Sequence, residues 1–511
     1  MTNTKAPTPQ PGTLRQWTNA LISRVHHVAT TEQPQTHQRT ERDYEDAHKH
    51  LRSSKGHAKR EQSFLFDQAT TAKFNALVLQ EHSRDCDEMG TPGFDHPPTT
   101  GVIYVMDRAT AKGWTYGDKT WGNFGQGAPE VGPIPDAIER PLSISMELDE
   151  FEYAPVAGIK SLRQAVANLY NVRYRENKES KYTWENVCIV PGGRAGLTRI
   201  AASIGDANVG FFLPEYTAYE ALLTIFKRFV PIPTPLDKDT NYHITPQRLY
   251  REIHDRGERP CLQVVVASNP SNPTGQLIEG EQLEKWVDIA RTTKTTMVLD
   301  EFYSSYIYTH PENLGKTVSS AEFVDDVNVD PIVILDGMTK NFRLPGWRVC
   351  WIVGPKEYIS SMASSGSFLE GGANHPLQKA AIPLLKPSNA FQDACALQTH
   401  FAMKRHYVLE RLDQLNLTVE IPPKATFYIW LDLAALPEPY CNGLTFFEAC
   451  LDEKMICVPG IFFDINPGRR RDLARSPYQG FVRLSFGPPL DELKTGLDGL
   501  ERLLKKIGYN S

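Results

Sequence analysis

A continuous run of apolar and β-branched residues, Leu262–Ala267, is the feature that most limits the folds open to this chain. Strands that are buried on both faces, as in a parallel sheet, have such uninterrupted runs. The run ends in Ser268-Asn-Pro-Ser-Asn-Pro-Thr-Gly275, whose prolines and glycine form rigid turns. Ligands bind at the carboxyl ends of strands in open α/β sheets. The segment therefore predicts an α/β fold with a mainly parallel sheet and a ligand site at the end of this strand.

A glycine turn at 192–193 gives a second indication of a ligand site. The sequence around it predicts a strand, the turn and then a helix. The first turn of such a helix has free N–H groups, which bind phosphate together with the helix dipole. Gly193, Arg194 and Ala195 are therefore the predicted phosphate-binding residues. Many α/β proteins contain a strand, a glycine pair and a helix, so this segment alone does not identify the ligand.

An amine and a guanidinium belong to one loop further along the chain. Lys340 lies between an apolar run that ends at Leu335 and a Pro-Gly break, and Arg348 precedes a second apolar run, Val349–Val353. Lysine forms Schiff bases with aldehydes, and the planar fork of arginine suits phosphate. Pyridoxal 5'-phosphate (PLP) contains both groups and is the expected cofactor. The alternative for an isolated lysine and arginine is a pair of surface cations.

Two further charges accompany apolar strands. Asp300 follows the predicted strand Thr296–Leu299, and Arg483 lies within the apolar segment Phe481–Phe486. Because burying an unpaired charge is unfavourable, Asp300 should meet a cation or several donors, and Arg483 should meet an anion. For Asp300 the alternative is that it caps a helix that follows the strand.

These segments resemble motifs of the class I/II aminotransferases, a family of PLP-dependent enzymes of fold type I. The lysine segment is similar to the family pattern S-x-[ST]-K-x-x-x-x-x-G-x-R-x-G, with Thr339, Lys340, Gly346 and Arg348 in register. Residues 268–275 resemble N-P-x-N-P-T-G, and residues 300–303 resemble D-E-x-Y. The resemblance extends over roughly residues 99 to 508.

Two positions of the lysine segment depart from the family pattern. Gly337 stands where the family usually has a serine, and Cys350 stands where it usually has a glycine. The family's serine contributes a bond to the cofactor phosphate, so its absence predicts compensation elsewhere or a weaker hold on the cofactor. Together with the long N-terminal segment, the departures predict a specialised substrate.

The resemblance implies a role for each matched residue. Lys340 would bind the cofactor as a Schiff base and move the proton of the substrate α-carbon, and Asp300 would keep the pyridine nitrogen protonated. The other implied contacts are Asn272 and Tyr303 with the phenolic oxygen, Tyr216 with the ring, Arg348 and the Gly193 turn with the phosphate, Tyr153 with the phosphate of a neighbouring subunit, and Gly127 and Arg483 with the substrate carboxylate.

Composition limits the class of protein. The 511 residues include 41% hydrophobic and 23% charged residues, as in globular proteins, and the length predicts two or three domains. A net charge of -6 gives no signal for nucleic acid, and no apolar run is long enough to span a membrane. The eight cysteines have no C-x-x-C or zinc spacing. We expect buried free thiols, no metal site and a cytoplasmic location.

The expected architecture is that of PLP fold type I, similar to aspartate aminotransferase. Residues 146–385 are predicted to form a large PLP-binding domain with a mainly parallel sheet, and residues 99–145 and 386–511 a smaller α/β domain. Residues 1–98 are predicted to be a partly flexible extension with short helices at Leu14–Val25 and Phe66–Gln80. A disordered or partner-binding arm is favoured there over an organellar transit peptide.

The sequence therefore predicts a PLP-dependent enzyme that acts on an amino acid, in the first place an aminotransferase that uses a 2-oxo acid as acceptor and works as a homodimer. One alternative is elimination, replacement or cyclisation at Cα or Cγ, as in enzymes of the 1-aminocyclopropane-carboxylate synthase type, with S-adenosylmethionine or another amino acid as substrate. Another is a transcription regulator with an aminotransferase-like domain. Its DNA-binding head would have to lie in residues 1–98, where no helix-turn-helix pattern is found.

Overall fold

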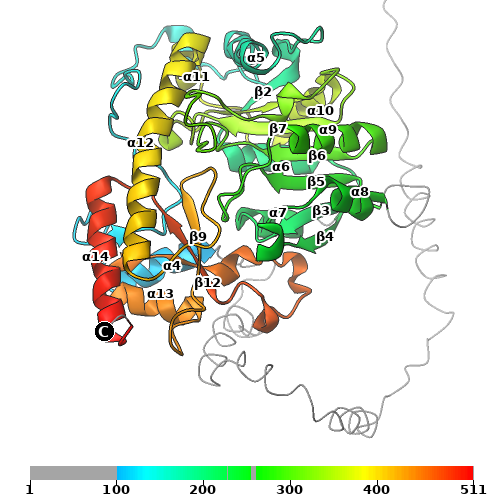
Figure 1. Ribbon diagram of the computed structural model, residues 1–511. Coiled ribbons are helices and arrows are strands. Elements are labelled where there is room, and N and C mark those ends of the chain that lie inside the picture. Colours follow the sequence, from blue (N-terminus) through cyan, green and yellow to red (C-terminus); the bar gives the residue numbers. More distant parts are fainter. Residues whose placement is uncertain (1–100, 227, 255–260, 510–511) are drawn as a thin grey trace, which may run out of the picture. The chain divides into compact units, whose positions relative to one another are not determined.

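A seven-stranded β-sheet lies at the centre of the part of the chain that carries the predicted motifs (Figure 1). The structure is a computed structural model that describes residues 101–226, 228–254 and 261–509. The predicted helices at Leu14–Val25 and Phe66–Gln80 lie outside the described residues. In chain order the strands of this sheet are β2 (Val187–Val190), β3 (Ala207–Leu213), β4 (Phe229–Pro235), β5 (Val264–Ser268), β6 (Thr296–Asp300), β7 (Ile332–Gly337) and β8 (Cys350–Val353).

The sheet is parallel except for one strand, in agreement with the prediction. Its order is β2-β8-β7-β6-β5-β3-β4, and β8 runs antiparallel to both of its neighbours. Every residue of β5 is buried, as the continuous apolar run predicts. The loop between β7 and β8 joins antiparallel neighbours, so it needs no crossover helix and can present side chains at the end of the sheet. Lys340 lies on this loop.

The sheet ends at a strand that its sequence does not predict. Strand β4 has the sequence FVPIPTP and pairs with β3, with Val209 opposite Pro231 and Phe211 opposite Pro233. Proline lacks the N–H that a central strand must donate, which restricts it to the edges of sheets. The prolines of β4 also prevent a further strand from pairing with this edge.

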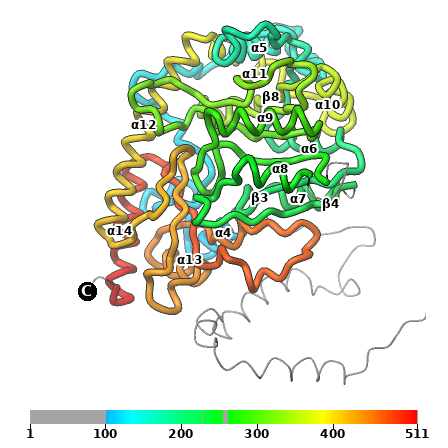
Figure 2. The backbone as a smooth tube through the Cα atoms, turned by 45° about the vertical axis from the view of Figure 1, so that its right-hand side comes forward, coloured from blue at the N-terminus to red at the C-terminus, as the bar shows by residue number. Residues whose placement is uncertain are grey.

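Helices cover the sheet, and one long helix runs past its side. Helix α12 contacts both α5 and α14, and Figures 1 and 2 show it extending from the region of α5 and α11 to that of α14. The helices are α4 (Gly101–Ala111), α5 (Lys160–Tyr174), α6 (Gly193–Ser203), α7 (Ala218–Ile225), α8 (Pro246–His254), α9 (Glu281–Thr293), α10 (Lys356–Leu369), α11 (His375–Ala381), α12 (Pro387–Gln414), α13 (Gly443–Asp452) and α14 (Leu490–Lys506).

Two small sheets are built from both ends of the described chain. Strands β9 (Tyr428–Asp432), β12 (Phe481–Ser485) and β11 (Val458–Pro459) form an antiparallel sheet with β12 in the middle. Strand β1 (Gly122–Asn123) pairs with β10 (Met455–Ile456) in parallel. The pairing brings the segment that follows β1 beside the C-terminal part of the chain. The division into a large and a small domain stays a prediction.

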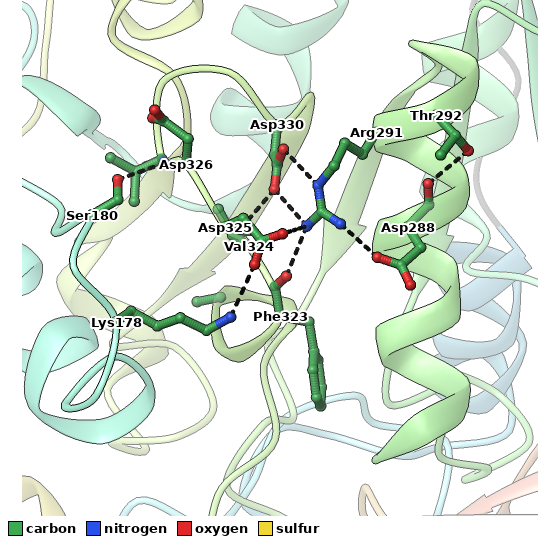
Figure 3. Close-up of polar contacts among 12 residues, drawn as sticks. Lys178, Ser180, Asp288, Arg291, Thr292, Phe323, Val324, Asp325, Asp326 and Asp330 are labelled. Atoms are coloured by element: carbon green, nitrogen blue, oxygen red, sulfur yellow. Dashed lines mark hydrogen bonds and ion pairs between the residues drawn. The ribbon is translucent and has the colours of Figure 1, made fainter.

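A group of charges fixes the loop that leads into β7. Arg291, on α9, forms ion pairs with Asp288 at 2.5 Å, Asp330 at 2.8 Å and Asp325 at 3.1 Å (Figure 3). Hydrogen bonds to Asp330 raise the pKa of Arg291 above its usual value. Asp330 precedes β7, whereas Lys340 follows that strand, so this group lies at the opposite end of β7 from the lysine loop.

Two segments are interrupted, and one expectation needs correction. Helix α11 ends at Ala381 and continues as a 3-10 turn, and the segment that begins at Met455 consists of the short strands β10 and β11 followed by a 3-10 turn. Among the described cysteines, three that were expected to be buried are only partly so: Cys261, Cys395 and Cys441. Within the described residues, no helix is long and apolar enough to cross a membrane.

Candidate active site

A cavity of about 400 Å³ contains most of the predicted site residues. It lies where strands of the large sheet end, and residues 126–128, which follow β1, together with one side chain each from β9 and β12 complete its lining. Its volume is within the range of pockets that bind small molecules. The cavity is lined by Val102, Gln126, Gly127, Ala128, Gly193, Arg194, Leu197, Tyr216, Thr217, Ser268, Asn272, Asp300, Phe302, Tyr303, Thr339, Lys340, Pro345, Arg348, Tyr428 and Arg483.

Lys340 faces this cavity from the loop between β7 and β8. Its Nζ donates a hydrogen bond to the carbonyl oxygen of Gly127, and its own carbonyl accepts a hydrogen bond of 2.9 Å from the hydroxyl of Tyr306. Burial, in the first place, and the positive charge of Arg483 lower the pKa of Lys340 to about 8. A larger fraction of the side chain is therefore the neutral amine, which is the nucleophilic form.

Asp300 lies at the carboxyl end of β6 and is buried. Its Oδ2 accepts a hydrogen bond of 3.0 Å from the hydroxyl of Tyr219, and its Oδ1 accepts one of 3.4 Å from the backbone N–H of Phe302. Burial raises the pKa of Asp300 to about 6. Asp300 has no ion pair with any residue that the structure describes. No α-helix follows it directly, so the alternative role as a helix cap is wrong.

The turn before α6 is shaped around Arg348. Gly192 has a φ of 99°, and a Cβ at this position would lie 1.8 Å from Nη2 of Arg348. Only glycine therefore fits between the turn and the guanidinium. Gly192 is the N-cap residue of α6 and supplies no side-chain cap, so the first N–H groups of the helix remain available to a ligand. The cation and the helix terminus together suit a phosphate.

Arg483 is buried in the middle strand of the small antiparallel sheet and is only 2% exposed. Its Nη1 donates to Oδ1 of Asn272 at 2.9 Å, and its Nη2 donates to the carbonyl of Gly125 at 3.1 Å. The guanidinium stacks 4.2 Å from the ring centre of Tyr428, whereas Nε has no hydrogen-bond partner within the described residues. Arg483 forms no ion pair with a described residue. The buried cation therefore matches the expectation that it binds an anion.

The structure adds two tyrosines that the sequence alone did not single out. Tyr219 holds Asp300, as described above. Tyr428, on β9, shares a hydrogen bond of 2.7 Å with the hydroxyl of Tyr303. The pKa of Tyr303 is raised above its ordinary value, first by burial and then by Tyr428. Spacing gives a weak signal for Tyr219, three residues after Tyr216, but none for Tyr428, because strand pairing brings it to the site.

Two of the twelve predicted site residues do not line the cavity. Ala195 lies in the first turn of α6, one residue beyond Arg194. Tyr153 is 93% exposed and borders a separate hollow formed by residues 150–154 and 371–376. A single copy of the chain therefore does not bring Tyr153 to the cavity. Its predicted role in a neighbouring subunit's site remains a prediction.

The residues present fit PLP. Asp300 is a buried carboxyl group without a cationic partner among the described residues, and a protonated pyridine nitrogen would be such a partner. Lys340 supplies an amine with a lowered pKa, and Arg348 with the Gly192 turn supplies a cradle for phosphate. A metal site is a poorer explanation, because the described residues contain no cluster of three or more His, Cys, Asp or Glu side chains able to hold an ion.

Comparisons with known proteins agree with this geometry. The profile of the family described as Aminotransferase class I and II matches residues 119–500. The chain is 25% identical over 387 residues to the "Probable aspartate/prephenate aminotransferase" of Aquifex aeolicus (strain VF5), covering 75% of this chain and 91% of that protein. It is 27% identical over 363 residues to the "Probable N-acetyl-LL-diaminopimelate aminotransferase" of Bacillus subtilis (strain 168), covering 69% and 82%.

Solved structures share the fold. The aspartate aminotransferase of Thermus thermophilus with maleate aligns with a TM-score of 0.65 and 21% identity, over 81% of this chain and all of that one (100%). An aminotransferase from Mycobacterium tuberculosis gives a TM-score of 0.65 with 21% identity, over 82% of this chain and 100% of that one. The predicted α/β fold, similar to that of aspartate aminotransferase, is confirmed.

Proposed function

The chain belongs to the class I and II aminotransferases, and on this premise we propose that it binds PLP covalently at Lys340 and transfers the amino group of an amino acid to a 2-oxo acid. Membership of this family makes the protein an enzyme that acts on amino acids. We infer from the side chains that line the cavity which residues hold the cofactor and which contact the substrate.

One observation carries the proposal: two buried groups of opposite charge face one cavity, and neither has an ion-pair partner among the described residues. They are Asp300 and Arg483. An unpaired buried charge is costly, so each group is better explained by a bound counter-charge. A pyridinium nitrogen would be the partner of Asp300, and a substrate carboxylate would be the partner of Arg483.

Each side chain then has a defined task. When bound, PLP supplies an aldehyde for the amine and a ring that accepts the electrons left at the substrate Cα. Lys340 would hold the cofactor, and its amine would move the proton at Cα. Asp300 would keep the proton on the ring nitrogen. Arg348 and the Gly192 turn would hold the phosphate, with the backbone of Gly193, Arg194 and Ala195.

The remaining predicted residues orient these groups. The Oδ1 of Asn272 accepts from Arg483, which leaves the amide N–H₂ of Asn272 to donate to the cofactor's phenolic oxygen. Tyr303 would donate to the same oxygen, and Tyr216 would pack on the ring. The substrate carboxylate would be bound by Arg483 and by the backbone N–H of Gly127. With its carboxylate held between these groups, the substrate would direct its Cα–H bond, which is the bond to be broken, toward Lys340.

We further propose that the working unit is a cytoplasmic homodimer. Apolar side chains at Leu142, Leu148 and Phe151 are exposed in the single chain, on the segment that leads to Tyr153. Several large apolar side chains exposed on one segment support an interaction site there. Pairing of two copies through this segment would cover it and bring Tyr153 toward the partner's phosphate group. The cytoplasmic location is supported by the free cysteines of the described residues.

The test uses the purified full-length protein loaded with PLP. Each of the common amino acids is added without an acceptor, and the cofactor absorbance is followed; pyruvate or 2-oxoglutarate is then added and products are identified. Transfer to the acceptor is the expected result. Release of ammonia, or of a product that has lost its γ-substituent, with no transfer to either acceptor would replace the proposal by elimination or replacement chemistry. S-adenosylmethionine is included so that cyclisation is tested as well.

A further inference from the structure

The side chains of Glu130, His400 and Lys404 meet at the loop that carries Gly127. One oxygen of Glu130, Oε1, lies 2.8 Å from Nζ of Lys404 and 2.5 Å from Nε2 of His400. Both partners belong to α12. The side chain of Lys404 is completely buried, and that of Glu130 is 14% exposed. A lysine without contact with water is found in proteins almost only when it is paired, so Glu130 is its required counter-charge.

The electrostatics of this junction are those of a buried ion pair. Burial alone would raise the pKa of Glu130, but the hydrogen bond from His400 and the charge of Lys404 lower it to about 2. Burial lowers the pKa of Lys404 to about 8, against the attraction of Glu130. Both groups are therefore mainly charged at neutral pH. Removing one partner would leave the other charge buried and uncompensated.

The junction also includes the chain just after Arg483. The carbonyl oxygen of Gly487 accepts a hydrogen bond of 2.9 Å from Nζ of Lys404 and one of 3.0 Å from the backbone N–H of Glu130. Glu130 is three residues from Gly127, and Gly487 is four residues from Arg483. Lys404 thus ties together the two segments that carry the proposed carboxylate-binding groups.

Arg343 is a second cation that holds the same loop, from the side of the Lys340 segment. Nη1 of Arg343 donates to the carbonyl of Glu130 at 3.1 Å and to that of Gly132 at 2.6 Å. Arg343 is buried and lies three residues after Lys340. The loop is consequently held between the lysine segment and α12. Its position relative to Lys340 depends on contacts from both sides.

We propose that the Glu130–Lys404 ion pair, supported by His400, is a positioning device for the substrate carboxylate: it fixes the separation between the N–H of Gly127 and the guanidinium of Arg483. None of the three side chains lines the cavity, so their effect on substrate is exerted through these two groups. The inference rests on the proposed function, because that proposal assigns the carboxylate to Gly127 and Arg483.

Glu130→Ala, Glu130→Gln and Lys404→Met test the inference. Glu130→Ala should raise KM for both the amino acid and the 2-oxo acid by about tenfold or more. The N–H of Gly127 and the guanidinium of Arg483 would then no longer both reach the substrate carboxylate. The kcat should fall by a smaller factor than the one by which KM rises, since the carboxylate also orients Cα toward Lys340, and the cofactor absorbance should be unchanged. Glu130→Gln should restore part of the loss, because its amide oxygen can still accept from His400 and Lys404. If Glu130→Ala does not fold, Glu130→Gln and Lys404→Met carry the test.

The control variant is Arg291→Met, which removes another ion-paired cation between a helix and a loop, at the far end of β7. It should lower Tm and leave KM unchanged. The affinity of the PLP form for pyruvate gives a readout without turnover, because this form has no amino group to transfer. This affinity should fall by the same factor in Glu130→Ala. A lower Tm with wild-type KM and pyruvate affinity in the Glu130 and Lys404 variants would overturn the inference.

The two proposals can fail separately. If the wild-type protein transfers no amino group but its pyruvate affinity still drops in Glu130→Ala, the proposed function is wrong and the positioning role stands. If the wild type transfers amino groups and the variants bind substrates as tightly as it does, the positioning role is wrong and the proposed function stands.

Discussion

Gly337 and Cys350 are direct partners across strands β7 and β8, and a Cβ on Gly337 would lie 2.6 Å from the Cα, Cβ and Sγ of Cys350. The two positions that depart from the family's lysine motif are therefore in direct contact. Cys350 occupies the space that any side chain at 337 would need. Its thiol instead shares a contact of 3.2 Å with the hydroxyl of Thr339, next to Lys340.

The first prediction follows from this pair. Gly337→Ser alone should reduce the free energy of unfolding by about 1–3 kcal/mol, because the added side chain overpacks a buried strand pair. Gly337→Ser combined with Cys350→Gly should regain only the part of that loss that comes from Cβ and Sγ of Cys350, because the Cα at position 350 stays in place. Denaturant unfolding of the cofactor-free protein measures both. If Gly337→Ser is as stable as the wild type, the strands move apart without cost and the prediction is wrong. What a serine adds to PLP affinity is measured in the double variant.

The second prediction concerns the substrate anion. Arg483→Ala should leave the cofactor absorbance intact and lower kcat/KM by about a hundredfold or more, since losing one partner of a buried charge pair costs about 2–5 kcal/mol. The matched control is Arg470→Ala, which removes an exposed arginine from the loop before β12. Steady-state kinetics with one amino acid and one 2-oxo acid decide the result. A change of less than threefold in Arg483→Ala would mean that another group binds the carboxylate.

The third prediction is a pH dependence. Burial and the nearby charge of Arg483 lower the pKa of Lys340 to about 8, so the neutral, reactive amine increases about tenfold between pH 7 and pH 9. The rate at which the cofactor-free protein captures PLP should rise over this range and then level off. Stopped-flow absorbance measures the rate. Arg483→Met removes a cation that disfavours the charged amine, so its midpoint should move to higher pH; a rate independent of pH in both proteins would contradict the assignment.

The sequence predicts those parts of the fold and site whose signals are local. The run at Leu262–Ala267 and the turns after it place β5 and Asn272 because apolar continuity and proline geometry act within a few residues. Strand β4 was not predicted, since its alternating prolines oppose strand formation except at an edge, and the edge is a property of the whole sheet. Residues that act through tertiary contacts were missed for the same reason.

Glu130 and Lys404 illustrate this second limit. They are 274 residues apart in the chain, and nothing near either residue in the sequence indicates a buried ion pair: Glu130 ends a glycine-rich turn, and Lys404 is one of several polar residues on a long helix. Only the packing of α12 against the loop after β1 shows that the lysine is buried and paired. Tyr428 is similar, because its contact with Tyr303 joins strand β9 to the turn that follows β6, across 125 residues.

The last prediction concerns Tyr153, whose side chain is 93% exposed in one copy. If two copies pair through the segment around it, its hydroxyl donates to the partner's cofactor phosphate, and a hydrogen bond to a charged group contributes about 1.5–3 kcal/mol. Tyr153→Phe should then weaken PLP affinity by about tenfold to a hundredfold while light scattering still detects a dimer. Tyr116→Phe is the matched control, because Tyr116 is 88% exposed and lies outside the predicted interface. Unchanged affinity in Tyr153→Phe would contradict the role of this hydroxyl, and a monomer that keeps full activity at nanomolar concentration would contradict the dimer itself.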